Sequence, residues 1–180
     1  MIFSETKLTG VYVIDIEKIE DERGFFARTW DKKKFLEMGL ESEFVQFSIS
    51  KNSKKNTFRG MHYQAKPYEE TKIVRCTKGK IFDIIIDLRP NSKTFKEVFS
   101  IELSENNYKI LYIPKGFAHG FQTLEENSEV FYQISQHHMQ EFARGITWND
   151  SKFNIKIPEE ISVISSKDLL YEPFKEEGRN

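Results

Sequence analysis

Residues 58–64, with the sequence FRGMHYQ, bring an arginine, a histidine and a glutamine together in a run typical of a β-strand. The two-residue alternation of a strand predicts that His62 and Gln64 share one face. Arg59 and Met61 are then expected on the opposite face. Because imidazole titrates near neutral pH, His62 could transfer protons in a pocket beside the strand. The alternative is a core histidine whose nitrogens bond to backbone carbonyls.

A second candidate histidine, His119, lies between Phe117 and Phe121 at the same two-residue spacing. A histidine flanked by aromatic rings is either a packed core residue or a ligand contact. The pattern Pro114-x-Gly116-x-x-His119 resembles the second motif of the cupin superfamily, whose members are small β-barrels with a jelly-roll topology.

The resemblance to cupins also bears on whether the chain binds a metal. Many cupins hold a metal through two histidines and a carboxylate of a first motif and one histidine of the second. The first motif would need His-x-His here, yet Gln64 stands where the second histidine belongs. His62 and His119 alone are too few ligands for a dedicated transition-metal centre. We therefore expect no bound metal, and a metal-dependent cupin such as an oxygenase is the alternative enzyme class.

Three further residues could complete a proton-transfer set. Lys72 alternates with apolar residues, so its ammonium could stabilise an oxyanion near the interior, or it could be an edge lysine that reaches solvent. Tyr132 also alternates with apolar residues, which suits either a core tyrosine or a general acid. Asp168 ends the pattern Ser165-x-x-Asp168, and the residues alone favour helix capping over catalysis.

The elements that position these residues are predicted to be mostly strands, because short alternating or apolar segments recur between turn residues. The expected strands are residues 11–16, 24–30, 44–50, 58–64, 72–77, 81–88, 98–103, 110–113 and 129–135. A short helix is expected after Asp31, which can cap it, and it should end at Gly39. The arm from Ser165 is expected to form another short helix. The prediction is an all-β, cupin-type jelly-roll barrel with a few short helices, in one domain over residues 1–180.

Composition narrows the class of protein. The 180 residues include 38% hydrophobic and 31% charged residues with a net charge of −1, which is ordinary for a soluble globular protein. This balance gives no electrostatic case for a nucleic-acid or membrane partner. The longest apolar run, residues 84–86, is too short to span a bilayer. Cys76 is the only cysteine and the N-terminus lacks a signal-peptide pattern, so we expect a cytoplasmic protein.

Taken together, these segments resemble one family, the dTDP-4-dehydrorhamnose 3,5-epimerases and related nucleotide-sugar epimerases of the cupin superfamily. The matching segments, in order, are residues 21–26, 59–64, 72–76, 83–89, 113–121, 144–150 and 165–168. The resemblance implies a homodimeric jelly-roll barrel that needs no metal or other cofactor. It also implies that the substrate is a nucleotide-linked 4-keto-6-deoxyhexose, inverted at C3, C5 or both through an enolate.

The resemblance further implies roles for individual residues. His62 would be the base, Asp168 the carboxylate that orients it, and Tyr132 the acid on the opposite face. Lys72 would lie near the keto oxygen. The remaining matches are substrate-binding positions: Arg59, His119, Gln46, His138 and, for the nucleotide diphosphate, Arg23 and Lys167.

Five positions depart from the pattern of the dTDP-rhamnose enzymes. Those enzymes usually carry glutamate in place of Arg28, Asp-Asn in place of Phe47-Ser48, tyrosine in place of His138 and glutamate in place of Ala143. In that family these positions contact the nucleotide or its surroundings, so CDP- and GDP-linked sugars are the alternative substrates. A catalytically silent sugar-nucleotide binding module is a further alternative, although binding alone does not require the proton-transfer set.

Overall fold

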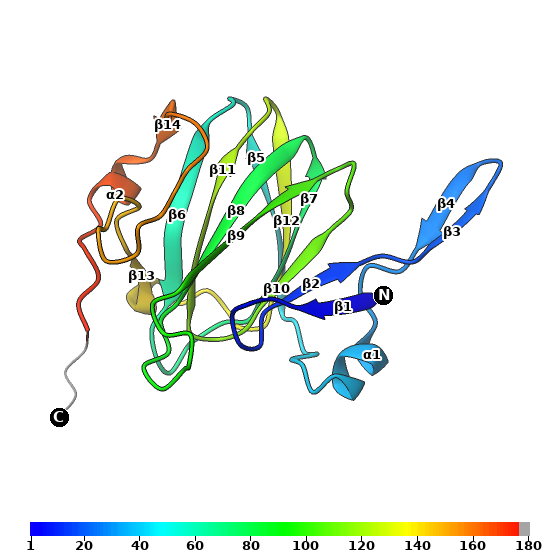
Figure 1. Cartoon of the computed structure of the whole chain (residues 1–180), viewed down its shortest axis with the longest axis horizontal. Helices are drawn as coiled ribbons and strands as arrows, with labels where there is room; N and C mark the ends of the chain where they lie inside the picture. Colours follow the sequence, from blue (N-terminus) through cyan, green and yellow to red (C-terminus); the bar gives the residue numbers. More distant parts are fainter. Residues whose placement is uncertain (177–180) are drawn as a thin grey trace.

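The computed structural model describes residues 1–176, which are built almost entirely of β-strands (Figure 1). One sheet has the strand order β1 (Ile2–Glu5), β2 (Tyr12–Asp15), β10 (Ile110–Ile113), β7 (Lys72–Lys78), β12 (Ser128–Ile134) and β5 (Gln46–Asn52). The other has the order β13 (Ala143–Gly145), β6 (Thr57–Gln64), β11 (Phe117–Thr123), β8 (Lys80–Asp87) and β9 (Val98–Ser104). A two-residue strand, β14 (Val163–Ile164), adds to β6 in parallel.

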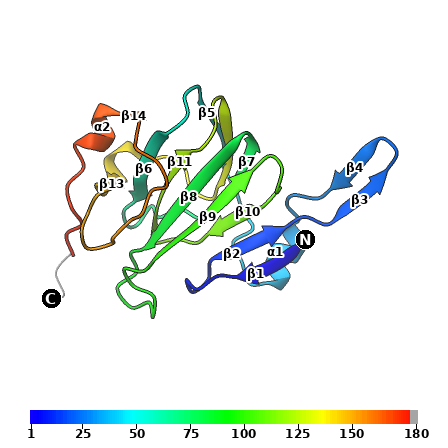
Figure 2. The same ribbon diagram turned by 45° about the horizontal axis from the view of Figure 1, so that its top comes forward.

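The N-terminal region differs most from the sequence-based expectation. Residues 24–30 do not form one barrel strand; instead β3 (Lys18–Asp21) and β4 (Gly24–Ala27) form a hairpin that projects from the barrel (Figures 1 and 2). All four residues of β3 are exposed, so β3 has no buried face and lacks the apolar alternation by which a strand is recognised. The helix that follows, α1 (Lys32–Glu37), is capped by the Asp31 carboxylate, as predicted.

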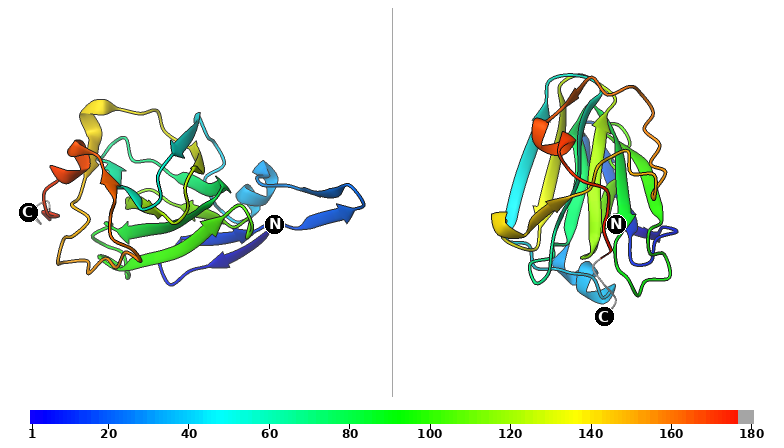
Figure 3. Two further views of the ribbon diagram at one scale, coloured as in Figure 1. Left: turned by 90° about the horizontal axis from the view of Figure 1, so that it is seen from above. Right: turned by 90° about the vertical axis from the view of Figure 1, so that its left-hand side faces the viewer.

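The C-terminal region covers the outer face of the second sheet. Ile84 and Ile86, which alternate on β8, pack there against Phe153. The chain then runs through β14 and the short helix α2 (Ser166–Leu169) beside β6, at the end of the molecule opposite the β3–β4 hairpin (Figure 3). The expected short helix after Ser165 is therefore confirmed. None of the helices within residues 1–176 is long and apolar enough to cross a membrane.

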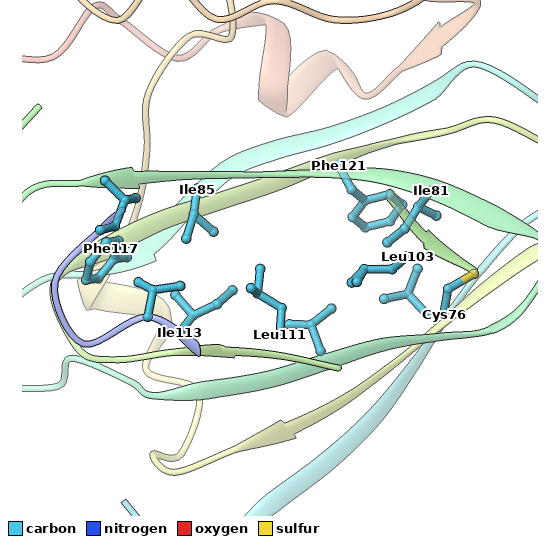
Figure 4. Packing of buried hydrophobic residues seen from close by; sticks show 12 residues of the cluster. Cys76, Ile81, Ile85, Leu103, Leu111, Ile113, Phe117 and Phe121 are labelled. Atoms are coloured by element: carbon cyan, nitrogen blue, oxygen red, sulfur yellow. The ribbon is translucent and has the colours of Figure 1, made fainter. Parts of the chain in front are cut away.

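The space between the two sheets is filled by every second side chain of the facing strands. Ile81 and Ile85 of β8 and Phe121 of β11 meet Leu111 of β10 and Cys76 of β7 in this core (Figure 4). Two sheets packed in this way bury one face of each strand, which is what the period-two pattern of the sequence predicts. The all-β jelly-roll barrel of the cupin type is thus confirmed.

Candidate active site

A β-bulge in β6 changes the faces predicted for its residues. β6 pairs His62 with His119 and Arg59 with Phe121 of β11, so an interval of three residues in β6 faces an interval of two in β11. Because directly paired residues point to the same side of a sheet, Arg59 and His62 share the inner face. The prediction that Arg59 lies opposite His62 is therefore wrong. The extra residue shifts the alternation by one and sends Met61 to the outer cluster instead.

Gly60 makes this bulge possible. Its φ is +135°, and a Cβ on it would lie 2.5 Å from the Cα of Gly120 on β11, so no other residue fits. β14 pairs with residues 57–58 and β13 with residues 62–64, while Met61 exchanges backbone hydrogen bonds with Ile146, which leaves Arg59 and Gly60 without a strand partner on this edge of β6. α2 packs at this gap, and the Gly60 N–H donates to Oδ2 of Asp168 at 3.2 Å.

Asp168 reaches His62 through the same gap. Its Oδ1 lies 2.8 Å from Nε2 of His62, whose side chain is partly exposed. Ser165 accepts the N–H of Asp168 at 3.0 Å, so Ser165 caps the helix and the Asp168 carboxylate is left for the histidine. Burial acts to raise the pKa of Asp168, but hydrogen bonds from His62, Gly60 and Ser165 outweigh it and hold this pKa below its usual value. The ionised carboxylate can stabilise an imidazolium at His62.

The second histidine is buried deeper in the barrel. Nε2 of His119 lies 2.6 Å from Oδ1 of Asp83 on β8, and both side chains are buried. Tyr132 contacts the His119 ring edge-on, with centroids 6.0 Å apart, and it comes from β12 in the sheet opposite His62. Burial and the negative charge of Asp83 raise the pKa of Tyr132, while the positive charge of Arg59 opposes them. Tyr132 therefore keeps its proton at neutral pH.

Two cations in the barrel are each held by one neighbour. Nε of Arg59 donates to Oδ1 of Asn52, a buried residue of β5, at 2.6 Å. Nζ of Lys72 lies 2.8 Å from a carboxylate oxygen of Glu70, and both of these side chains are largely buried. The burial of Lys72 agrees with the prediction that its ammonium lies near the interior.

Gln64 occupies the position where a metal-binding cupin would carry its second histidine. Its amide nitrogen donates to the carbonyls of Tyr68 at 2.9 Å and His137 at 3.2 Å. Its amide oxygen accepts the N–H of Met139 at 2.6 Å. Gln64 thus ties two loops to β6. Within residues 1–176, no group of three or more His, Cys, Asp or Glu side chains is arranged to hold a metal ion.

Comparison with known proteins matches residues 5–176 to the family model described as dTDP-4-dehydrorhamnose 3,5-epimerase. The enzyme of that name from Shigella flexneri is 39% identical over 94% of this chain and 94% of its own length. The chain belongs to the dTDP-4-dehydrorhamnose 3,5-epimerase family. It is an isomerase, and the resemblance read from the sequence is confirmed.

Solved structures of family members agree with the fold. The dTDP-4-dehydrorhamnose 3,5-epimerase of Elizabethkingia anophelis superposes with a TM-score of 0.92 at 38% identity, covering 97% of this chain and 96% of that one. A dTDP-6-deoxy-D-glucose-3,5-epimerase of Legionella pneumophila, in complex with dTDP-4-keto-L-rhamnose, superposes with a TM-score of 0.89 at 31% identity. That comparison covers 96% of this chain and 92% of the other.

The positions predicted to bind substrate come from several elements of this epimerase. Gln46 and His138 are joined directly, because Oε1 of Gln46 accepts the N–H of His138 at 2.7 Å. Lys167 is exposed on α2, next to Asp168. Arg23 lies apart, at the turn of the β3–β4 hairpin, where its 84% exposed side chain pairs with a carboxylate of the same turn. Within one chain, the β3–β4 hairpin that carries Arg23 projects away from β6, the strand that carries His62 (Figure 1).

The departures from the family pattern do not all face the barrel. Ser48 is the register partner of Tyr132, so it shares the inner face with the tyrosine. Phe47 points to the outer face and is 60% exposed. Nε of Arg28 lies 3.7 Å from Oδ2 of Asp31, the residue that caps α1. Among these three departures, Ser48 alone alters the lining of the inner face beside Tyr132.

Sequence analysis missed three residues that hold the predicted ones in place. Asp83 pairs with His119, Asn52 with Arg59 and Glu70 with Lys72. A signal for Asp83 existed, because it is the one charged residue among the otherwise apolar residues 81–86, and a buried charge needs a partner. Asn52 and Glu70 stand among polar residues, so their sequence context carries no such signal.

Proposed function

We propose that the chain inverts C3 and C5 of a dTDP-linked 4-keto-6-deoxyhexose, as in the conversion of dTDP-4-dehydro-6-deoxyglucose to dTDP-4-dehydrorhamnose, without metal or other cofactor. The observation that carries the proposal is the placement of His62 on β6 and Tyr132 on β12, in the two facing sheets. Inversion needs proton-transfer groups on both sides of the sugar, because one base alone returns the proton to the side it came from. The names of the relatives support the dTDP sugar.

In the first step, the neutral imidazole of His62 removes the proton from the carbon next to the ketone. The electron pair of the broken C–H bond moves into the carbonyl and gives an enolate. The Asp168 carboxylate, 2.8 Å from the ring, offsets the charge of the imidazolium that forms. The ammonium of Lys72, which is largely buried, would stabilise the enolate oxygen in a partly dry site.

In the second step, Tyr132 returns a proton to the opposite side of the same carbon. Its O–H bond breaks as the new C–H bond forms, and the enolate electrons restore the ketone. Its raised pKa keeps Tyr132 protonated until this step, and the positive charge of Arg59 stabilises the phenolate left behind. His62 and Tyr132 then exchange protons with water, which resets both groups.

The remaining predicted positions are proposed to bind the substrate. Arg59 and His119 share the inner face with His62 and suit contacts to the sugar. Lys167, one residue before Asp168, suits the diphosphate, and the joined pair Gln46 and His138 suits the nucleoside. CDP- and GDP-linked sugars are the alternative substrates, since Ser48 stands where the dTDP-rhamnose enzymes carry asparagine.

We also propose that the enzyme is a homodimer in the cytoplasm. The β3–β4 hairpin exposes Ile19 and Phe26, and a two-stranded hairpin is only marginally stable in water unless it packs against something. The outer face of β5 exposes Phe47 and Ile49. A second copy covering these residues would bring Arg23, at the tip of the hairpin, to the partner's barrel. The single free thiol is compatible with a reducing compartment.

Incubation with dTDP-, CDP- and GDP-linked 4-keto-6-deoxy sugars in D₂O, followed by NMR, tests the reaction. We expect deuterium at C3 and C5 of the dTDP sugar, with faster exchange than in the other two sugars. No exchange with any of the three would contradict the epimerase proposal. A stoichiometric bound metal that activity requires, detected by elemental analysis, would favour the metal-dependent alternative.

Light scattering after size-exclusion chromatography tests the assembly. The expected molar mass is twice the chain mass of 21.3 kDa. Phe47→Glu should shift the protein toward the monomer, because it buries a charge in the contact. Leu170→Glu, just after α2 at the end of the molecule opposite the β3–β4 hairpin, is the matched control and should leave the dimer intact (Figure 1). A monomer for the unchanged chain would contradict the dimer.

A further inference from the structure

Tyr171, which follows α2, lies against the imidazole of His62. The two ring centroids are 5.7 Å apart and the rings are inclined at 73°, which is an edge-to-face contact. Asp168, three residues earlier, binds Nε2 of the same imidazole. Residues 168–171 therefore contact His62 twice, through a carboxylate and through an aromatic ring.

The Tyr171 ring rests on the backbone of Gly145. Gly145 is the register partner of His62 between β13 and β6. A Cβ on Gly145 would lie 2.2, 2.3 and 2.4 Å from three atoms of the Tyr171 ring, far inside van der Waals contact. Gly145 does not have a positive φ, so its backbone would accept another residue. The glycine therefore provides space, and the ring of Tyr171 fills that space beside the histidine.

Residues that follow Tyr171 are also anchored, by hydrogen bonds and by packing. The N–H of Thr147 donates to the carbonyl of Glu172 at 3.2 Å. The N–H of Phe174 donates to Oδ2 of Asp150 at 2.6 Å, and the Phe174 ring packs against Phe153. With α2 on one side and these contacts on the other, the position of the Tyr171 ring is fixed.

We propose that Tyr171 is a positioning residue for His62 in the epimerisation, and this inference rests on the proposed role of His62 as the base. One hydrogen bond at Nε2 leaves the imidazole free to turn, because the second side-chain torsion of histidine has a broad energy minimum. The ring seated on Gly145 removes that freedom. It holds Nε2 toward Asp168 and leaves Nδ1 for the substrate proton, and a base held in the reactive orientation transfers protons faster.

The aromatic ring of Tyr171 makes the contact, and its hydroxyl is not needed for it. Burial and the negative charge of Asp168 raise the pKa of Tyr171, so the side chain stays neutral at working pH. A neutral ring against an imidazole is a packing contact that phenylalanine can reproduce. This separates the proposal from a role for Tyr171 as an acid.

Kinetics of substitutions at Tyr171 test the positioning role. Tyr171→Ala should lower kcat about tenfold and change KM less than about threefold, because orientation of the base is lost while binding groups remain. Tyr171→Phe should recover kcat. Leu170→Ala, at the adjacent and 81% exposed position, is the matched control and should leave kcat and KM unchanged. Thermal unfolding of each variant separates loss of kcat from loss of the fold.

A double-mutant cycle tests whether the contact of the Tyr171 ring with Gly145 positions His62. Gly145→Ala should lower kcat as much as Tyr171→Ala, because the new methyl group displaces the ring. Adding Gly145→Ala to Tyr171→Ala should cost nothing more. Additive losses would overturn the proposal, and so would an unchanged kcat in Tyr171→Ala.

NMR tests the contact independently of turnover. The chain has four histidines, so the Cε1–Hε1 signal of His62 can be assigned by its loss in His62→Gln. This signal should shift in Tyr171→Ala, through loss of the ring current, and remain in place in Tyr171→Phe and Leu170→Ala. An unshifted signal in Tyr171→Ala overturns the proposal whatever the enzyme's activity. A shifted signal in a chain that exchanges no sugar proton would instead overturn the proposed function.

Discussion

His62 and His119 lie in the same sheet, and each is paired with a carboxylate. The two histidine–carboxylate pairs differ in their surroundings. In the first, His62 has a 41% exposed side chain and Asp168 a 5% exposed one, at 2.8 Å. In the second, His119 is 5% exposed and Asp83 fully buried, at 2.6 Å. The histidines are register partners on neighbouring strands. The same two chemical groups, side by side, therefore have unequal access to substrate and water.

The two carboxylates also differ in their other partners. Asp168 receives hydrogen bonds from the Gly60 backbone and from Ser165 besides His62. Oδ2 of Asp83 has no hydrogen-bond partner within residues 1–176, and its charge instead acts on Tyr132. The imidazole of His62 is open to solvent, whereas both members of the second pair are shielded from it. The exposure of the histidine and the partners of its carboxylate, rather than residue type, distinguish the proposed base His62 from the proposed binding residue His119.

The largest expected effect contrasts the two histidines. His62→Ala should lower solvent exchange at the sugar carbons about a thousandfold, because general-base catalysis is lost. His119→Ala should retain far more exchange and should chiefly raise KM. Exchange rates measured by NMR in D₂O compare the two variants. Equal losses of exchange would show that His62 and His119 do not have the different roles proposed for them.

A smaller loss is expected from Asp168→Asn. An amide cannot stabilise the imidazolium and can donate to the histidine, which disfavours the tautomer that the base needs. We expect kcat to fall about a hundredfold with the fold intact. Steady-state kinetics and far-UV circular dichroism check this expectation, and kcat near that of the unchanged enzyme would show that the carboxylate is not needed.

Asn52→Ala should affect binding more than turnover. Without its acceptor at 2.6 Å, the guanidinium of Arg59 is free to move, and the proposed sugar contact weakens. We expect KM to rise about tenfold with kcat changed less than about threefold, since one hydrogen bond to a charged group is lost. Ser53→Ala, at the next and exposed position, is the matched control. A fall in kcat alone would place Arg59 in the chemical step instead.

The smallest effect concerns stability in acid. The pKa of Asp168 is lower in the folded protein than the ordinary value near 3.9, so its contribution to stability is present above about pH 4. That contribution is lost as the pH falls through the lower folded-state pKa. The free energy of unfolding of Asp168→Asn should therefore decrease less between pH 7 and pH 3 than that of the unchanged chain. Urea unfolding measures this, with Glu126→Gln, which removes one exposed carboxylate, as control.

Much of the fold follows from local patterns, and the site does not. Alternation of apolar side chains predicts β6, β7 and β8 to within a few residues, because each buries one face in the core. The bulge at Gly60 depends on the register of β6 against β11, which no short window of sequence specifies. The contact between His62 and Asp168 joins residues 106 positions apart, so local pattern indicated a helix cap there. The family resemblance supplied the partnership that spacing could not.

Tyr132→Phe in D₂O, with exchange and inversion measured on the same sample, tests the central claim most directly. The claim is that His62 removes the proton from one wall and Tyr132 returns it from the other. We predict that deuterium still enters the sugar, because His62 is intact, while inversion falls about a hundredfold for want of the acid. Equal loss of exchange and inversion, or unchanged inversion, would contradict the account.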